Sequence, residues 1–390
     1  MKTSKIIFAS DFAPIRAFAP IMAADPEKIY GDLLGTLRSA DLGIVNLESP
    51  LAGPGEFIAK SGATFTGGPE HVAALTAGGF TVAVCANNHT FDRGEAGFFR
   101  TRDLLTAHGV AAVGAGRDLA EARRELALTV GDTRIGLFTI SEGEDMRGAT
   151  ETTPGVRPWE VERLADDIRA ARSKYDVIMV SAHCGLENQP YPSFYVYEAF
   201  RSWAAAGADI IIGHHPHVPQ GVTSFDGVPA YFSLGNFVFY QPVKLFYRKT
   251  GFLLEMTCGG GRLLAHRPIP YRIGDEGLRL LAGTELDEFH AGLARLSAPL
   301  ASPETARAAW HAVLAANGVA GFEAELARIL ETMRQDPVKG AAMLRNRVTC
   351  VQHSTQWIDG MSRIMAGSIT DAPAEMVATV REFLTREIGR

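Results

Sequence analysis

The sequence contains residues with metal-binding side chains that each follow a short apolar segment. These residues are Asp11, Glu48, Asn88, His89, His183 and, within the cluster GHHPH, His215 and His217. The set offers carboxylates, imidazoles and an amide oxygen, and it includes no cysteine. Ligands of these types suit borderline divalent ions such as Mn²⁺, Fe²⁺ or Zn²⁺. The pattern therefore predicts a cofactor of one or two divalent transition-metal ions, which can convert water to hydroxide near neutral pH.

The apolar segments are interpreted as buried strands, because they are short and bounded by turn residues. They cover residues 5–9, 42–45, 81–85, 111–113, 177–181 and 210–212. Amphipathic stretches lie between them, near residues 27–40, 69–78, 94–108, 157–173 and 193–207. This alternation favours an α/β fold built from βαβ units. Ligands of such sheets gather at the carboxyl ends of the strands, so we expect the metal-binding residues to share one site.

Two segments interrupt the alternation, and the composition changes near the end of the chain. Residues 125–140, turned at Gly131-Asp132, and residues 252–273, turned at Gly259-Gly260-Gly261, predict β-hairpins. After about residue 275, Ala, Leu, Glu and Arg recur with helical periodicity. The clearest predicted helices cover residues 285–297, 302–316, 321–334 and 371–388. We expect one domain over residues 1–274 and a helical extension over residues 275–390.

The bulk composition is that of a globular protein with a substantial core. Of the 390 residues, 46% are hydrophobic and 21% are charged. A net charge of −6 gives no general attraction to nucleic acid or anionic membranes. The apolar stretch at residues 6–9 is too short for a signal peptide, and no run reaches the roughly 18–20 apolar residues of a membrane helix. The four scattered cysteines are typical of reduced thiols.

These features lead us to expect a soluble cytoplasmic protein that binds neither nucleic acid nor membranes. A small-molecule substrate is expected, which the family resemblance described below extends to a polyglutamate-type anionic substrate, and a homo-oligomer is compatible with the sequence.

The positions of individual residues suggest different roles within the expected site. If the strand before GHHPH continues through Ile212, then His214 and His215 point to opposite sides, so only one of them faces the metal together with His217. We favour His215. Asp92, three residues after His89, is placed to orient that imidazole.

Other residues near the expected site have weaker signals. Arg16 could bind a substrate anion, since guanidinium matches carboxylate and phosphate geometry. Cys184 lies beside His183, but a cysteine between small residues at a strand end is typically buried and inert. Cys350 and His353 have ligand-like spacing, but two residues do not make a metal site. We interpret them as part of a helix face that packs on the α/β body.

Longer motifs carry a family resemblance. The chain contains, in this order, NLESP (46–50), ANNHTFDRG (86–94), AHCGLE (182–187), GADIIIGHHPHVPQG (207–221) and YFSLGNFVF (231–239). Together these motifs resemble the CapA-type proteins, which are named for poly-γ-glutamate capsule synthesis and belong to the calcineurin-like metallophosphoesterase superfamily. The resemblance spans roughly residues 5–270. It implies a metallophosphoesterase-like four-layer αββα sandwich, to which a helical C-terminal extension is attached.

The resemblance also implies a role for each matching position. Metal ligands are implied at Asp11, Glu48, Asn88, His183, His215 and His217, with Glu48 as the carboxylate that bridges two ions. His89 is implied as the acid or transition-state stabiliser, and the predicted catalytic pair is therefore His89 and Asp92. Glu187 and Asn236 match motif positions that line the substrate pocket, and with Arg16 they form the predicted substrate-binding set.

One position departs from the superfamily pattern. Superfamily members have a histidine two residues after the first aspartate, where this chain has Ala13. One metal site keeps a full set of ligands, whereas the other is reduced to Asp11, Glu48 and His217. The second ion could bind weakly, borrow His214 or be absent.

We therefore expect a metal-dependent hydrolase in which metal-bound hydroxide attacks an anionic substrate. The resemblance implies a γ-glutamyl amide or a phosphoester as that substrate. The alternative is a non-catalytic polymer-binding or assembly subunit of poly-γ-glutamate capsule synthesis. Ala13 favours this alternative, whereas the grouping of His89 with Asp92 favours the hydrolase.

Overall fold

The predicted strands form two main β-sheets. The protein is described by a computed structural model over residues 2–53, 55–143 and 145–388. The first sheet has the order β16-β15-β14-β1-β2-β3-β4, and β13 also pairs with β1. Its strands are β1 (Ser4–Ala13), β2 (Leu42–Leu47), β3 (Phe80–Val84), β4 (Ala111–Val113), β13 (Asn236–Phe239), β14 (Thr250–Cys258), β15 (Leu263–Ile273) and β16 (Leu278–Leu280).

The second sheet has the order β11-β12-β10-β9-β7-β6. Its strands are β6 (Leu126–Val130), β7 (Thr133–Ser141), β9 (Val177–His183), β10 (Ile210–His214), β11 (Val222–Phe225) and β12 (Val228–Tyr231). A small ribbon joins β5 (Ala115–Gly116) to β8 (Gly155–Val156). Both predicted hairpins are confirmed, since β6 pairs antiparallel with β7 and β14 pairs antiparallel with β15.

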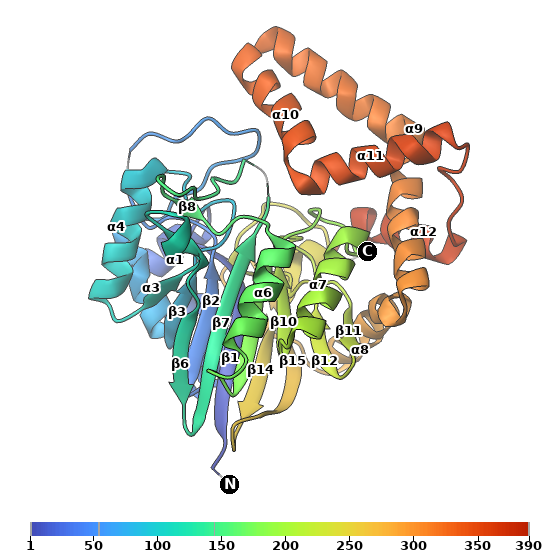
Figure 1. Cartoon of the computed structure of the whole chain (residues 1–390). Coiled ribbons are helices and arrows are strands. Elements are labelled where there is room, and N and C mark those ends of the chain that lie inside the picture. The colour runs from blue at the N-terminus through green and yellow to red at the C-terminus, as the bar shows by residue number, and fades with distance from the viewer. Residues whose placement is uncertain (1, 54, 144, 389–390) are drawn as a thin grey trace.

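The two sheets pack face to face, and helices cover their outer faces (Figure 1). The core between the sheets contains Phe8 and Ile44 from the first sheet and Met179 and Ile212 from the second. The helices over the first sheet are α1 (Phe18–Ala24), α2 (Leu34–Arg38), α3 (Val72–Ala77) and α4 (Gly94–Ala107), with 3₁₀ turns η1 (Lys28–Leu33) and η2 (Pro69–His71). The helices over the second sheet are α6 (Val161–Ala171) and α7 (Phe194–Ala206), and α5 (Leu119–Arg123) lies near β5. The predicted four-layer αββα sandwich is confirmed.

The chain is helical over residues 284–385, as predicted, and this helical part lies against one end of the sandwich (Figure 1). Its elements are α8 (Thr284–Ser297), η4 (Ala298–Ala301), α9 (Pro303–Gln335), α10 (Pro337–Thr349), α11 (Val351–Met365) and α12 (Ala374–Thr385). The helices predicted at 302–316 and 321–334 are the two arms of α9, which meet at Gly318, where φ is +59°. The clearest helical patterns in the sequence did not include α10 and α11.

The helical part packs on the sandwich through a shared apolar cluster. Tyr191 and Val218 of the α/β part contact this cluster, and Trp310, Phe322 and Phe383 supply it from the helices. The first sheet extends to β16, beyond residue 274, and the division into two domains at that residue stays a prediction. Among the described helices, none combines the length and apolarity needed to cross a membrane.

Parallel pairing brings the motif-bearing strand ends to one edge of the sandwich. β1, β2 and β3 are parallel neighbours, and so are β7, β9 and β10. Gly213 allows β10 to pass close to the segment that follows β12, just before His214 and His215. A Cβ at this position would lie 2.0 Å from the backbone oxygen of Phe232. The absence of a side chain at Gly213 therefore sets the position of the residues that follow.

We expect Gly213→Ala to lower the free energy of unfolding by about 1–3 kcal/mol, because the added methyl group has no space. Gly292→Ala is the matched control, since a Cβ at that helical position meets no atom within 4 Å. The control should leave stability unchanged or raise it by up to about 1 kcal/mol. Thermal and urea unfolding of both variants measure the difference, and equal stability of the two would contradict the packing argument.

Candidate metal centre

Candidate ligands from both sheets meet at the carboxyl edge of the sandwich. Asp11 lies within β1, Glu48 follows β2 and Asn88 follows β3. His183 ends β9, and His215 and His217 follow β10. All six side chains are buried, with at most 5% of the residue surface exposed. The structure thus brings together the whole set of metal ligands proposed from the sequence.

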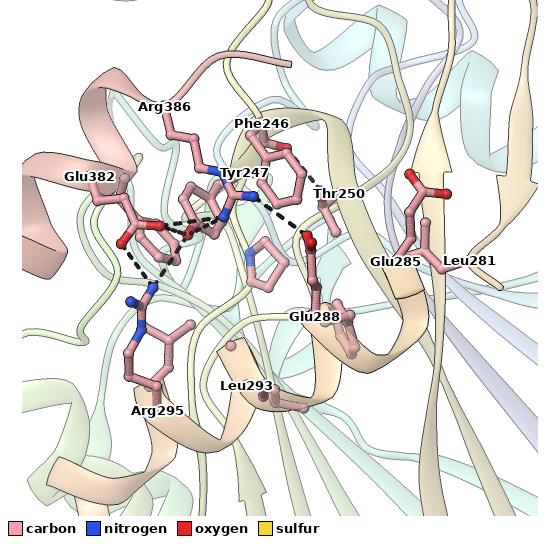
Figure 2. Close-up of a pocket in the computed structure, with 16 residues that line it drawn as sticks. Phe246, Tyr247, Thr250, Leu281, Glu285, Glu288, Leu293, Arg295, Glu382 and Arg386 are labelled. Carbon is pink, nitrogen blue, oxygen red and sulfur yellow. Dashed lines mark hydrogen bonds and ion pairs between the residues drawn. The ribbon is translucent and has the colours of Figure 1, made fainter. Parts of the chain in front are cut away.

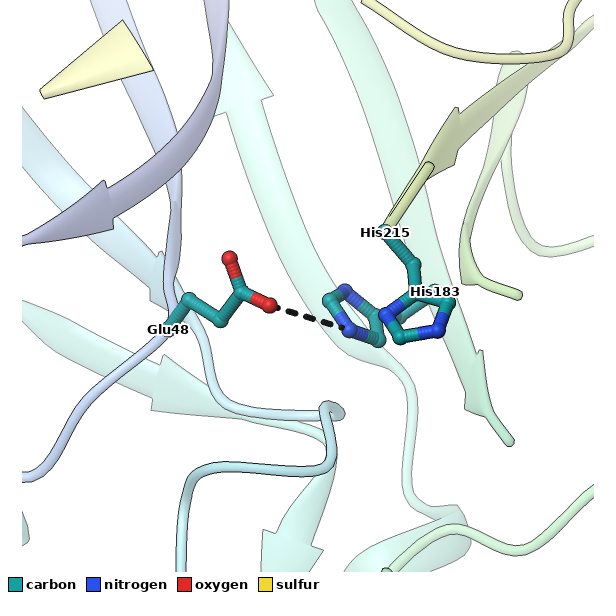
Figure 3. A group of neighbouring side chains, drawn as sticks. All are labelled: Glu48, His183 and His215. Atoms are coloured by element: carbon teal, nitrogen blue, oxygen red, sulfur yellow. Dashed lines mark ion pairs between the residues drawn. The ribbon is translucent and has the colours of Figure 1, made fainter. Parts of the chain in front are cut away.

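Glu48, His183 and His215 form the most compact group. Figure 3 shows their side chains pointing toward one another. Each offers one ligand atom, and these atoms lie within 4.8 Å of one another. The Nε2 atom of His183 lies 3.4 Å from Oε1 of Glu48 and 2.9 Å from Oδ1 of Asn88. Four side chains therefore surround one point, as tetrahedral or higher coordination requires.

The surroundings of Glu48 test whether these residues fit a metal ion. Both of its carboxylate oxygens are buried, and neither accepts a hydrogen bond from the described residues. A buried carboxylate without donors is costly unless a cation compensates its charge. Burial, followed by the nearby carboxylate of Asp11, raises the pKa of Glu48 well above its ordinary value. These conditions fit a divalent ion held between Glu48 and the imidazoles.

The buried surroundings give His183 and His217 different protonation states. Burial, followed by the neighbouring imidazole of His215, lowers the pKa of His183 well below its ordinary value, so the ring is neutral. Burial also lowers the pKa of His217, but the carboxylates of Glu48 and Asp11 outweigh this effect and raise it. The side of the centre near His217 therefore attracts positive charge, which an ion or a proton can supply.

Asp11, Glu48 and His217 form a second group of ligand atoms within 4.8 Å. The Nδ1 atom of His217 lies 3.4 Å from Oδ2 of Asp11, and its Nε2 atom lies 3.8 Å from Oε1 of Glu48. Ala13 does not face this group but belongs to an apolar cluster with Ile15 and Phe239. The second group therefore keeps only the reduced ligand set predicted from the sequence.

His214 lies beside the second group, where its ring is held by other contacts. Its Nδ1 atom lies 3.1 Å from the hydroxyl of Ser10, and the ring stacks on Phe8 with 5.4 Å between centroids. The same nitrogen is 3.9 Å from Oδ1 of Asp11. His214 and His215 thus have different neighbours, as expected, and His215 is the one that joins Glu48 and His183.

His89 and Asp92 form a hydrogen-bonded pair next to the ligands. The Nδ1 atom of His89 lies 2.7 Å from Oδ2 of Asp92, so Nε2 is the nitrogen left for a substrate. Lys60 completes the group: its ammonium lies 2.9 Å from Oδ1 of Asp92 and 2.8 Å from the backbone oxygen of Asn88. Burial, followed by the charge of Lys60, lowers the pKa of His89 below its ordinary value. The arrangement holds one ring orientation and keeps the ring neutral.

A cavity of about 310 Å³ lies beside two of the candidate ligands and His89. Its wall includes Asn88, His89 and His217 together with charged residues on the outer side. Arg16 and Glu187, both predicted to bind substrate, lie on this wall, and so does Arg248. The third predicted substrate-binding residue, Asn236, lies elsewhere.

Asn236 is buried behind His217 and does not line the cavity. Its Oδ1 atom lies 2.9 Å from Nδ1 of His217, and its amide nitrogen donates to the backbone oxygens of His217 and Arg248. All of its hydrogen-bonding groups are therefore engaged within the protein. We assign Asn236 an orienting role toward His217 in place of the substrate contact expected from the motif.

Three of the six described non-glycine residues with positive φ lie at the site. His215 and His217 have φ values of 97° and 57°, and Arg16 on the cavity wall has a φ of 53°. Residues other than glycine in this region cost about 1–3 kcal/mol each and are kept where surrounding structure over-determines them. The strained positions coincide with candidate ligands and the cavity rim, which supports a functional site.

The structure adds residues that sequence reasoning missed. Asn46 donates to Oδ1 of Asp11 at 2.8 Å and lies 3.3 Å from Nδ1 of His183, so its amide connects the two ligand groups. Its place in the NLESP motif was a usable signal. Lys60 and Gln352 had no such signal, since they reach the site from an irregular loop and from the helical part. Burial raises the pKa of Cys184 well above its ordinary value, in agreement with an inert thiol.

A separate cavity of about 400 Å³ lies between α8, α12 and the 3₁₀ turn η3 (Tyr247–Lys249). Figure 2 shows that its charged residues face one another across the space. Nη2 of Arg295 lies 3.0 Å from Oε2 of Glu382, and Nη2 of Arg386 lies 3.5 Å from Oε2 of Glu288. Within each pair the positive and negative charges neutralise one another, so we attribute the cavity to the packing of the helical part.

The fold and the site together define an α/β two-sheet protein with a candidate metal centre at the carboxyl edge of its sheets. The chain belongs to the bacterial capsule synthesis protein PGA_cap family, whose model matches residues 5–241. The resemblance to CapA-type proteins is thereby confirmed.

The chain is also similar to named relatives and, more distantly, to solved structures. The PGA biosynthesis protein CapA of Bacillus subtilis is 35% identical over 44% of this chain and 46% of its own length. The capsule biosynthesis protein CapA of Bacillus anthracis is 33% identical over 44% of this chain and 43% of its own length. This chain thus spans less than half the length of these two relatives. A 5′-nucleotidase precursor from Thermus thermophilus is 15% identical over 77% of this chain and 59% of that chain, with a TM-score of 0.42.

We expect His183→Ala and Glu48→Gln to remove most of the divalent metal bound by the purified protein, because each substitution deletes a ligand of the compact group. His108→Ala is the matched control, since this histidine is exposed. Elemental analysis after equilibration with Mn²⁺ or Zn²⁺ measures the metal content. Equal metal content in His183→Ala and the control would contradict the assignment.

We also expect the affinity for Mn²⁺ to fall as the pH falls from about 8 to about 5, because ligands must be deprotonated to bind. The raised pKa of Glu48 means that protons compete for this ligand at a higher pH than for an ordinary carboxylate. Calorimetric titration at a series of pH values measures the change. An affinity that is constant over this range would show that Glu48 does not bind the ion.

Proposed function

We propose that the protein is a metal-dependent hydrolase that acts on an anionic substrate. One observation carries this proposal: the candidate ligands Asn88 and His217 and the imidazole of His89, which Asp92 orients, line the same cavity. An ion alone would also suit a structural role. A buried, oriented imidazole beside the ion, which is not needed as a ligand, is what hydrolysis requires.

The residues of the centre divide into two ligand sets. Glu48, Asn88, His183 and His215 would hold one ion, and Asp11, Glu48 and His217 a weaker second one. When bound, a divalent ion such as Mn²⁺, Zn²⁺ or Fe²⁺ supplies Lewis-acid activation of water and of the scissile bond. The chain itself supplies the buried carboxylates and neutral imidazoles that such an ion prefers.

The His89 ring would take up and release the proton that is transferred during hydrolysis. Its Nδ1–H is donated to Asp92, which stabilises the imidazolium that forms when Nε2 takes up a proton. Lys60 keeps the Asp92 carboxylate in place and holds the backbone of Asn88 at the same time. The buried ammonium of Lys60 therefore positions both Asp92, which orients His89, and the backbone of the candidate ligand Asn88.

The charges on the cavity wall support an anionic substrate of the γ-glutamyl type. Arg16 and Arg248 offer guanidinium groups that pair with carboxylates or phosphates. Glu187 on the same wall offers a partner for an ammonium group. A γ-glutamyl amide with a free amino-acid end carries both a carboxylate and an ammonium, whereas a simple phosphoester carries only the anion. The γ-glutamyl amide is therefore our first choice and the phosphoester our second, and the cytoplasmic location stays a prediction.

A non-catalytic polymer-binding role is the second candidate, and Ala13 is the observation that favours it. Ala13 stands at the sequence position where a further ligand of the second ion is expected, and it packs in an apolar cluster with Ile15 and Phe239. In that case, the same basic wall would bind a polyglutamate chain without cleaving it. The two functions differ in their dependence on His89.

We expect His89→Ala to lower turnover by about 10²–10⁴-fold while metal content stays the same, because the variant loses the proton-transfer group and no ligand. Hydrolysis of a γ-glutamyl anilide and of an aryl phosphate in the presence of Mn²⁺ measures the effect, with His108→Ala as the control. If metal-loaded wild-type protein cleaves neither compound but binds polyglutamate equally well with and without His89, the polymer-binding role replaces the hydrolase.

A further inference from the structure

The helical C-terminal part reaches the metal centre through Gln352, which lies outside the family-matched residues 5–241. Gln352 is the second residue of α11 and is fully buried. Its Oε1 atom lies 2.9 Å from Nε2 of His215. A side chain of the extension therefore contacts a candidate ligand directly.

The amide of Gln352 has a defined orientation. Its nitrogen lies 3.3 Å from Nε2 of His353, where an amide donor meets a ring acceptor. The amide oxygen is thereby turned to His215. An amide oxygen only accepts hydrogen bonds, so Nε2 of His215 must carry the proton, and Nδ1 carries the lone pair that a metal ion needs.

The start of α11 is held against the α/β body. The buried carboxylate of Glu142, just after β7, accepts hydrogen bonds from the backbone amide of Gly185 at 2.9 Å and from the hydroxyl of Tyr195. The backbone amide of Gln352 also stabilises this carboxylate. Glu142 in turn donates its own backbone amide to the oxygen of His183. The N-terminus of α11 is thus anchored next to a second candidate ligand.

The rest of α11 is braced within the helical part. The indole nitrogen of Trp310 on α9 donates to Asp359 at 2.8 Å, and that of Trp357 donates to Glu325 at 3.0 Å. Two tryptophan hydrogen bonds therefore tie α11 to the long helix α9. A helix fixed at its start and along its length can place a side chain reproducibly.

The neighbouring helix α10 contacts the other half of the site. The ammonium of Lys339 donates to the backbone oxygens of Lys60 at 3.0 Å and Gly62 at 3.1 Å. Lys60 is the residue that holds Asp92 and the backbone of Asn88. The extension therefore contacts the candidate ligand His215 directly and reaches the proton-transfer pair through Lys60.

We propose that Gln352 is a positioning residue of the metal centre, which fixes the ring orientation and tautomer of His215 and so directs its Nδ1 atom to the ion. The inference rests on the proposed function only in requiring that an ion binds at this site. It assigns the C-terminal helices a part in the centre itself, because α11 delivers the hydrogen-bond acceptor. Partners of this kind typically change metal affinity by 10–100-fold.

The test measures Mn²⁺ affinity of the full-length protein by calorimetry and by the electron paramagnetic resonance signal of free Mn²⁺. Gln352→Met removes the acceptor while keeping the side-chain length, and we expect it to weaken binding by about 10–100-fold. Gln352→Glu keeps an oxygen acceptor and should bind Mn²⁺ as tightly as wild type. Gln356→Met, one turn further along α11 and half-buried, is the matched control and should also bind normally.

The outcomes separate this inference from the proposed function. If wild-type protein binds Mn²⁺ and Gln352→Met binds it equally tightly, Gln352 is a packing residue and the inference fails, while the hydrolase proposal stands. If wild-type protein binds no divalent ion, both fail. Should Gln352→Met not fold, as judged by circular dichroism, Gln352→Ala provides the acceptor-free comparison with Gln352→Glu. Equal affinity of those two variants would overturn the inference.

Discussion

The carboxylate of Glu48 lies in the interior without a hydrogen-bond donor among the described residues, and the rest of the site is arranged around it. An unpaired buried carboxylate costs several kcal/mol, which a protein recovers only with a compensating positive charge. The neighbouring His183 is neutral because burial lowers its pKa, so it offers a lone pair and no charge. Strained backbone at His215 and His217 adds to the cost of building this centre. A bound cation is the simplest compensation for the unpaired charge of Glu48 and for the cost of the strained backbone.

The same constraint explains why the centre needs parts from distant regions of the chain. Two packed sheets bring Asp11 and Glu48 close to His183. The His89–Asp92 pair and His215 are instead held by contacts from loops and helices. Lys60 performs this task for Asp92, and Gln352 for His215. Both supporting residues lie outside the strand-end motifs, and Lys339 links one of them to the helical extension. The extension is thus coupled to the site by direct contacts.

The PGA_cap family match and the residue Ala13 lead to different conclusions about the two ligand groups. The family match covers the strands that carry the candidate ligands, so the compact ligand group belongs to the shared part of the fold. Ala13, in contrast, turns one ligand position into part of an apolar cluster. The arginines on the cavity wall and Glu187 suit a substrate with both signs of charge. The proposed function rests on this combination of a complete first ligand group, a reduced second group and a charged cavity wall.

The sequence by itself determined the α/β alternation and the candidate ligands at the strand ends, because both depend on local pattern, and the family resemblance of its motifs implied the four-layer sandwich. Apolar segments predict strands, parallel strands end at one edge, and a polar residue after each segment therefore falls at that edge. Strand alternation also predicted that only one of His214 and His215 faces the metal, and the motif match implied His215. Only the tertiary structure could place Lys60, Gln352 and the buried Asn236. Their roles depend on contacts between segments far apart in the chain, for which neither periodicity nor spacing carries a signal.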